Sequence, residues 1–149
     1  MYKPDPPSRS IRRLPIGEAR HCRPYRTGKP YLYVMSSDGL NVDNLTSVRA
    51  DRPSWSPAGN VIAFTCGDPG PNFDICVVDV GTRKVSKLTD GGGTNEQPVF
   101  SPNGRHIAFH TTRYGGKKQI AIIDVTGKLQ KKVTDLGNNE FPTWARGHK

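Results

Sequence analysis

Two histidines provide the most suggestive metal-ligand spacing in this sequence. His106 and His110 fall in the stretch HIAFHT, and side chains four residues apart on a strand project from the same face. A zinc site needs further Cys, His or carboxylate ligands, yet the neighbouring stretches offer none at a recognisable spacing. We therefore expect exposed or edge histidines at these positions and no bound metal.

Aspartates could supply oxygen ligands or acid–base chemistry at the ends of the predicted strands. An aspartate in a turn commonly accepts hydrogen bonds from nearby backbone N–H groups, and no calcium-loop pattern surrounds any of them. We therefore expect capping roles for Asp38, Asp79, Asp90, Asp124 and Asp135.

Nucleophilic and phosphate-binding chemistry lack their usual signatures. The sequence contains no G-x-S-x-G elbow, no H-E-x-x-H pair and no phosphate-binding glycine loop ahead of a lysine. The glycine-rich stretch DGGGTN opens no predicted helix, so we interpret it as a flexible connector. We predict no catalytic residue, no cofactor and no enzymatic activity.

Positive charge is concentrated in the first 30 residues. This segment has eight basic residues against two acidic ones, a net charge of +6 out of +9 for the whole chain, and six prolines. Proline fixes φ and removes a backbone donor, and few apolar side chains are present to offset the entropy of ordering. We predict an extended, irregular basic arm over residues 1–30, without a helix or a ladder strand.

Three kinds of partner suit such an arm. Arginines along an extended chain can neutralise phosphates while Tyr25 stacks on a base, an anionic membrane surface attracts the same charges, and an acidic groove on a protein can be wrapped by a segment that folds on binding. Because no RNA-binding signature is present and the body carries only +3, we favour a protein. The candidate partner-binding residues are Arg9, Arg12, Arg13, Arg20, Arg23, Tyr25, Arg26 and Lys29, together with Trp144.

The elements that must position these residues form a repeat. PSWSPAGNVIAF at 53–64 returns as PVFSPNGRHIAF at 98–109, and a third copy begins as FPTW at 141–144. The SPAG and SPNG turns fit a bulged hairpin, because proline presets φ at the second position and glycine accepts a positive φ at the fourth. The alternating, β-branched pattern excludes a solenoid of helical repeats.

Short strands follow the same order in both units. Two come first, at 31–35 and 43–46; those of the first unit are 53–55, 61–66, 74–80 and 84–89, and those of the second are 98–100, 106–111, 119–125 and 129–134. Four short antiparallel strands per repeat are typical of a β-propeller blade. Trp55, Phe100 and Trp144 could form a stacking platform for bases or sugars, but their regular spacing favours packing between blades.

The run P-x-W-S-P-x-G-x-x-I-A-F, followed by D-I-x-V-x-D and x-L-T, resembles the WD-repeat-like blades of the TolB family over roughly residues 31–144. The resemblance implies an all-β fold, a partial β-propeller of four-stranded antiparallel blades behind the basic arm. We divide it into a partial blade at 31–52, blades at 53–97 and 98–141, and the start of a next blade at 142–149. The resemblance also permits calcium among loop carboxylates or along the channel of a closed ring.

Too few blades are present to close a ring of the usual four to eight, and an open wedge leaves apolar faces at both ends. We predict a non-catalytic interaction or assembly subunit that docks into a larger complex, which could lie at a membrane, through its open blade faces and its basic arm. The alternatives are a nucleic-acid-binding accessory protein that uses the arm, a ring built from copies of the chain around a peptide or ion, and a truncated fragment of a longer TolB-like protein.

The three cysteines favour a reducing compartment. Cys66 and Cys76 could lie on neighbouring strands of one hairpin, so a disulfide is conceivable, but with Cys22 the count is odd and no C-x-x-C spacing occurs. Free thiols are the plainer interpretation. The charged start MYKPDPPSRSIRRLP has no apolar stretch behind it, unlike a secretory signal, and no transmembrane run occurs. We predict a cytoplasmic protein, or one bound peripherally at the cytoplasmic face of a membrane complex.

Overall fold

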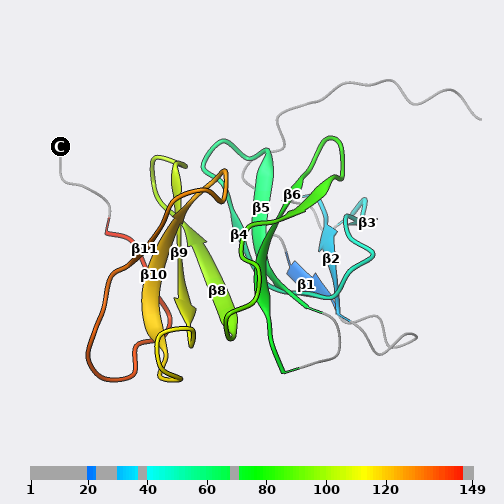
Figure 1. Ribbon diagram of the computed structural model, residues 1–149. Coiled ribbons are helices and arrows are strands. Elements are labelled where there is room, and N and C mark those ends of the chain that lie inside the picture. Colours follow the sequence, from blue (N-terminus) through cyan, green and yellow to red (C-terminus); the bar gives the residue numbers. More distant parts are fainter. Residues whose placement is uncertain (1–19, 23–29, 37–39, 68–70, 146–149) are drawn as a thin grey trace, which may run out of the picture.

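Three antiparallel sheets lie side by side in the described part of the chain (Figure 1). The computed structural model describes residues 30–36, 40–67 and 71–145, and the backbone alone of residues 20–22. The first sheet holds β1 (Arg20–Cys22), β2 (Tyr31–Val34) and β3 (Asp43–Asn44); the middle sheet holds β4 (Ala50–Trp55), β5 (Val61–Cys66), β6 (Asp74–Asp79) and β7 (Val85–Lys87); the third sheet holds β8 (Asn95–Phe100), β9 (His106–Thr111), β10 (Gln119–Asp124) and β11 (Gln130–Lys132). β4 contacts strands of both neighbouring sheets.

Matching turns open the two four-stranded sheets. Gly59 and Gly104 have φ of 72° and 71°, a region that glycine adopts without strain. The hydroxyls of Ser56 and Ser101 accept hydrogen bonds from the backbone N–H that begins the next strand, at 3.1 and 3.0 Å. The SPAG and SPNG turns are therefore conformational copies of each other, as the sequence predicts.

The alternation of side chains along the middle sheet divides the apolar residues between two cores. Phe64 packs with Leu32 in a cluster between the first and middle sheets, and Phe109 belongs to a second cluster between the middle and third sheets. Both phenylalanines are fully buried. Trp55 packs against the first cluster and Phe100 lies in the second, which confirms that these aromatics serve packing between sheets.

The strand positions agree closely with the repeat. The predicted strands at 61–66 and 106–111 coincide with β5 and β9. β4 and β8 begin three residues earlier than predicted. The prediction placed the start of each strand at its proline, but the proline lies in a bulge within the strand. The bulges contain Arg52 and Gln97, which have φ of 52° and 57°.

The prediction of an arm without a ladder strand is wrong at residues 20–22. β1 pairs antiparallel with β2, and Cys22 lies opposite Tyr31. The short run between Pro15 and Pro24 contains no proline, so its backbone N–H groups remain available for a ladder. The first sheet therefore has three strands rather than two.

The prediction of free thiols is wrong for Cys66 and Cys76, which form a disulfide with their Cα atoms 5.8 Å apart. Cys66 lies opposite Asp74 and Cys76 lies opposite Phe64, so the two cysteines are diagonal neighbours on one face of the hairpin. An odd cysteine count does not argue against such a local bridge. The described residues contain no helix that is long and apolar enough to cross a membrane.

Candidate functional site at the ends of the sheet stack

Exposed apolar side chains mark both ends of the stack of sheets. Of the large hydrophobic residues that are exposed in the described chain, none lies between residues 50 and 94. They are Leu40, Val42 and Val48 beside the first sheet, and Tyr114, Val125, Leu129, Val133, Leu136 and Phe141 in or after the third. Single exposed apolar residues are ordinary on protein surfaces, but these all lie in loops and segments next to the strands of the two end sheets, so the apolar surface of the described chain is concentrated at its two ends.

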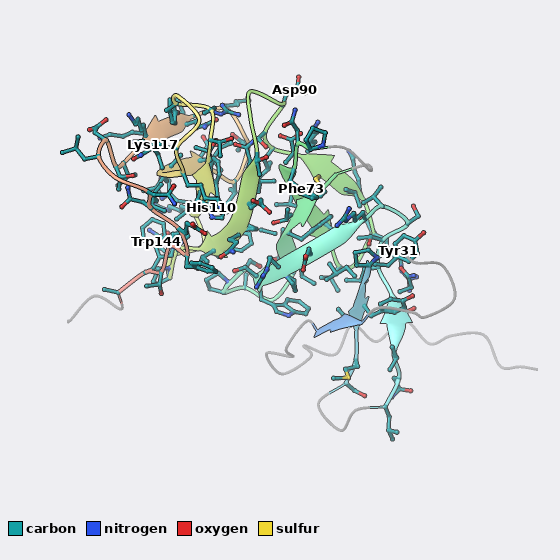
Figure 2. The ribbon with its side chains drawn as sticks, turned by 90° about the horizontal axis from the view of Figure 1, so that it is seen from below. Tyr31, Phe73, Asp90, His110, Lys117 and Trp144 are labelled. Carbon is teal, nitrogen blue, oxygen red and sulfur yellow. A yellow bond between two sulfur atoms is a disulfide. The ribbon has the colours of Figure 1, made fainter. Side chains whose placement is uncertain are left out.

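Trp144 lies at one end of the molecule and Tyr31 at the other (Figure 2). The indole Nε1 of Trp144 donates to the Val99 carbonyl on β8 at 3.0 Å, and the side chain is half-buried. A shallow cleft of about 350 Å³ beside it is lined by Pro57, Phe100 and other residues. The predicted partner-binding tryptophan therefore packs on the third sheet and keeps part of its ring exposed.

The segment Phe141–Trp144 begins with the positive φ that marks the bulge of β4 and β8, the first strands of the four-stranded sheets, and none of the described strands pairs with it. We predicted that a further blade begins here, yet residues 133–145 form no strand in the described structure. Phe141 nevertheless has φ of 54° immediately before a proline, which repeats the bulge conformation of Arg52 and Gln97. No strand within the described ranges forms a ladder with residues 141–144.

The same backbone hydrogen bond leads into all three of these inner segments. The backbone N–H at the start of each segment donates to the carbonyl of the residue just before a strand of the preceding sheet, namely β2, β6 or β10. The three bonds are Ala50 N to Pro30 O at 2.9 Å, Asn95 N to Phe73 O at 2.8 Å and Asn139 N to Lys118 O at 2.8 Å. Residues 139–144 therefore leave the third sheet along the path by which β4 and β8 leave the sheets before them.

A buried carboxylate ties the middle sheet to the segment that enters the third. Asp74 Oδ1 accepts from Thr89 Oγ1 at 2.7 Å, from Gly91 N at 3.1 Å and from Asn95 Nδ2 at 3.1 Å, while Oδ2 pairs with Lys87 Nζ at 2.7 Å. Burial by itself raises the pKa of Asp74, but the Lys87 ammonium and the other donors together hold it below its usual value. The carboxylate stays ionised and acts as a structural acceptor.

Gln119 occupies the equivalent place in the third sheet. Its Oε1 accepts from Thr134 Oγ1 at 2.7 Å and from Asn139 Nδ2 at 3.3 Å. Since a neutral amide performs the same function as the Asp74 carboxylate, acid–base chemistry is not what this position requires. Thr89 and Thr134, which recur at the end of each unit, were the sequence signal for this contact between neighbouring sheets. Asp74 itself was not singled out by the sequence.

The glycine-rich stretch DGGGTN makes specific contacts with the third sheet, and its flexibility stays a prediction. The Arg113 guanidinium donates to Gly91 O at 2.8 Å, and Thr94 N donates to Thr112 Oγ1 at 2.9 Å. Gly93 has φ of 116°, and a Cβ at this position would lie 2.7 Å from Thr112 Oγ1. Close approach of two chain segments explains a glycine here.

The two candidate metal ligands have opposite environments. His106 is exposed, whereas His110 is 1% exposed, with its Nε2 3.3 Å from Glu96 Oε2. The expectation of an exposed or edge residue is therefore wrong for His110. Burial lowers the pKa of His110, and this effect outweighs the Glu96 carboxylate, which raises it. In the part of the chain that the structure describes, no three His, Cys, Asp or Glu residues are grouped to hold a metal ion.

With this geometry, the comparisons with known proteins identify the fold. The sequence profile of the TolB β-propeller domain matches residues 19–147. The chain belongs to the TolB β-propeller domain family. The all-β stack of one three-stranded and two four-stranded antiparallel sheets is thus a partial TolB propeller, as the sequence predicts.

Solved structures with the same fold include two TolB proteins. A structure described as putative TolB from Agrobacterium tumefaciens shares 30% identity with this chain at a TM-score of 0.68, and TolB from Acinetobacter baumannii shares 28% at 0.64. The alignments cover 75% and 77% of this chain, but only 40% and 29% of those chains. This chain therefore matches less than half the length of either TolB structure.

More distant structures show the fold alone. A chain of the nidogen/laminin complex shares 15% identity at a TM-score of 0.57, with 70% of this chain and 40% of that chain covered. A lyase and several peptidases also contain this fold, so the TolB propeller fold by itself does not exclude catalysis. None of the curated proteins matches this chain.

The aspartates of this TolB propeller chain have local roles. Asp79 and Asp124 each accept a hydrogen bond from a backbone N–H in the following turn, at 2.7 and 3.0 Å, which confirms the predicted capping. Asp90 and Asp135 each pair with the lysine three residues before, at 3.6 and 2.8 Å. Asp38 lies outside the described residues.

Most of the predicted partner-binding residues also lie outside the described part of the TolB propeller chain. Arg20 contributes its backbone to β1, and Trp144 is described in full. The remaining predicted residues, Arg9, Arg12, Arg13, Arg23, Tyr25, Arg26 and Lys29, fall in the ranges that the structure does not describe. Partner binding by the arm therefore stays a prediction.

Proposed function

We propose that this TolB propeller chain is a non-catalytic interaction subunit that docks into a larger assembly through the two ends of its sheet stack. One observation carries the proposal: the exposed large apolar side chains of the described residues lie in loops and segments next to the strands of the first and third sheets, and none lies between residues 50 and 94. Each sheet of a repeat protein is stabilised by its neighbours. An end sheet without a neighbour is therefore a natural surface for another chain.

The buried titratable groups support a role without chemistry. The Asp74 carboxylate is occupied by donors from its own sheet and from the following segment, and the His110 imidazole faces Glu96. Nucleophilic catalysis requires a nucleophile within reach of a base, and these two groups are engaged in structural contacts instead.

The basic arm would add a second docking element. Its net charge of +6 suits an acidic groove on a partner, because complementary charge speeds association and favours the correct orientation. The cytoplasmic location stays a prediction. The disulfide between Cys66 and Cys76 favours an oxidising compartment instead.

Affinity purification of the full chain from its native cells, followed by quantitative mass spectrometry, tests the proposal. Leu136→Lys places a charge on the exposed end of the stack, where the leucine is 87% exposed. Ser86→Lys places the same charge on an exposed position of the middle sheet and serves as the control. We expect the proteins bound by the unmodified chain to be lost from Leu136→Lys and kept by Ser86→Lys. An identical set of bound proteins for all three chains would contradict docking through this end.

A further inference from the structure

The disulfide of the middle sheet lies in the wall of an open cleft. Cys66 on β5 and Cys76 on β6 form the bridge, and each cysteine is 5% exposed. A cleft of about 360 Å³ opens beside them, and its wall contains both cysteines together with Val48, Asp74, Val85 and Lys87. A cleft of this volume is large enough for a small ligand. It gives a thiol from solvent a route to the bridge of the folded chain.

The two sulfur atoms of the bridge differ in their charged neighbours. Lys87 on β7 lies directly opposite Cys76 in the ladder, whereas Asp74 lies directly opposite Cys66. Side chains that are directly opposite project from the same face of a sheet, with their Cβ atoms about 4.5–5.5 Å apart. A neighbouring cation stabilises a thiolate, and a neighbouring carboxylate disfavours one. Cys76 is therefore the better place for the negative charge that forms when the bridge opens.

The Lys87 ammonium is held beside the bridge by two carboxylates. Its Nζ pairs with Asp74 Oδ2 at 2.7 Å and with Asp90 Oδ1 at 3.6 Å. The hydrogen bond to Asp74 raises the pKa of Lys87, so the lysine keeps its charge at neutral pH. The other oxygen of Asp74 accepts three further hydrogen bonds, which fix the carboxylate and with it the position of the ammonium.

The third sheet shows that the same hairpin forms without a bridge. Thr111 and Ala121 stand at the positions of Cys66 and Cys76, and both are fully buried. β9 and β10 nevertheless pair along their full lengths, as β5 and β6 do. The backbone ladder of the middle sheet therefore does not depend on the disulfide, and the sheet can pass between a bridged and an open form while it stays folded.

The bridge belongs to the core between the first and middle sheets. Cys66 and Cys76 lie in the same apolar cluster as Leu32 of β2 and Leu45, and Trp55 packs against this cluster. A reduced cysteine behaves as a small apolar side chain with rotamers of its own, whereas the disulfide holds the two side chains together. Opening the bridge therefore loosens the packing that holds the first sheet against the middle one.

We propose that the Cys66–Cys76 bridge is a thiol-exchange site that a dithiol reductant opens, and that its opening loosens the joint between the first and middle sheets. A thiolate of the reductant attacks Sγ of Cys66, the S–S bond breaks, and its electron pair leaves on Sγ of Cys76 beside Lys87. The second thiolate of the reductant attacks the reductant sulfur of this mixed disulfide, so that Cys66 leaves as a thiolate. The two cysteines take up the two protons that the reductant lost, and the reductant becomes a disulfide. This inference goes beyond the proposed docking function, because it concerns the covalent state of the chain.

The rate at which dithiothreitol reduces the folded 149-residue chain tests the site. Every chain carries Cys22→Ser, so that alkylation and mass spectrometry count the thiols of the bridge alone. We expect a rate proportional to the dithiothreitol concentration, and a rate about three-fold lower for Lys87→Gln because the leaving thiolate loses its cation. Lys87→Arg keeps the charge and Lys84→Gln removes an exposed charge from the preceding turn, so both should keep the rate. A rate independent of dithiothreitol, which would mean reduction only after unfolding, or an undiminished rate for Lys87→Gln would overturn the inference.

Glutathione, which has a single thiol, identifies the sulfur that is attacked. With an alkylating agent present to trap the released thiolate, peptide mass spectra should show glutathione on Cys66 and the alkyl group on Cys76. The reverse pattern would overturn the assignment of Cys76 as the leaving group.

The emission wavelength of Trp55 reports the effect on the joint. Trp144→Phe leaves Trp55 as the single tryptophan of the chain. We expect reduction to shift its emission, reoxidation to reverse the shift, and the β-sheet circular dichroism to stay unchanged throughout. The same chain with Cys66→Thr and Cys76→Ala should show no response to dithiothreitol. An emission that ignores reduction, or loss of the β-sheet signal on reduction, would overturn the inference and leave the proposed docking function untouched.

Discussion

The joint between the middle and third sheets is complete, whereas the joint between the first and middle sheets is not. Across the complete joint, Phe100 N donates to Ser54 Oγ and Gln97 N donates to Thr65 Oγ1, both at 3.1 Å. Across the incomplete joint the apolar cluster is present, but Trp55 Nε1 has no acceptor in the described residues. The two joints thus share their apolar packing and differ in the polar contacts of the inner strand.

The comparison distinguishes two contributions to a joint: apolar burial, which all strands of a sheet share, and polar contacts, which come from the first strand of a four-stranded sheet. Burial of apolar side chains is non-directional, and the core residues of both clusters are at most 9% exposed although one of them includes the three-stranded sheet. Hydrogen bonds between neighbouring inner strands require that both are present. An unfinished blade therefore has a formed core and an unfinished polar joint.

The largest expected effects come from the apolar halves of the two joints. Phe64→Ala and Phe109→Ala each remove a fully buried ring at equivalent positions, and each should lower the free energy of unfolding by about 3–5 kcal/mol. Chemical denaturation measures both, with Leu129→Ala as an exposed control. A loss for Phe64→Ala far below that for Phe109→Ala would show that the first core is poorly formed.

The disulfide should stabilise the face of the middle sheet that meets the first. Cys66→Thr with Cys76→Ala copies the residues at the equivalent positions of β9 and β10. We expect this double variant to lose about 2–3 kcal/mol of unfolding free energy and to become insensitive to reductant. Equal reductant responses of the variant and the unmodified chain in thermal unfolding would argue against the bridge.

Asp74 tests the polar half of the complete joint. Asp74→Ala should lower the unfolding free energy by about 1–3 kcal/mol, because Thr89, Gly91 and Asn95 lose a buried acceptor. Asp74→Gln restores the side chain found at position 119 and should lose less. An alanine variant as stable as the unmodified chain in urea would contradict a structural role for this carboxylate.

His110 should give a smaller, pH-dependent effect within the third sheet. Burial holds the pKa of His110 below its ordinary value, so its stabilising contribution is fully present above the unfolded-state pKa of about 6.5 and is lost as the pH falls below it. We expect His110→Thr, with the residue found at position 65, to flatten the decline in stability between pH 7 and pH 5. An unchanged pH profile in denaturation would contradict this assignment, and His106→Thr provides the exposed control.

Periodicity was sufficient to predict the stacked sheets. The repeated apolar runs at 61–66 and 106–111 predict strands that are buried on both faces, and the SPAG and SPNG turns place each run relative to the strand before it. The same repeat predicted the packing of Trp55 and Phe100 between sheets, the SPAG and SPNG turns, and the partial propeller. These features are local or repeat at a fixed interval.

Features that depend on a contact between distant segments were missed. β1 lies between prolines and has no repeat of its own to indicate pairing with β2. His110 looks like a surface residue in the sequence, and only the packed sheet shows its burial beside Glu96. The Asp74 joint brings together residues up to 21 positions apart, and composition carries no signal for such a meeting.

Hydrogen exchange of the two indole N–H groups tests most directly whether the two joints differ in their polar contacts. Trp144 Nε1 donates to Val99 O at 3.0 Å, whereas Trp55 Nε1 has no acceptor among the described residues. We expect the N–H of Trp144 to exchange more slowly than that of Trp55. Equal protection of the two groups would contradict the account.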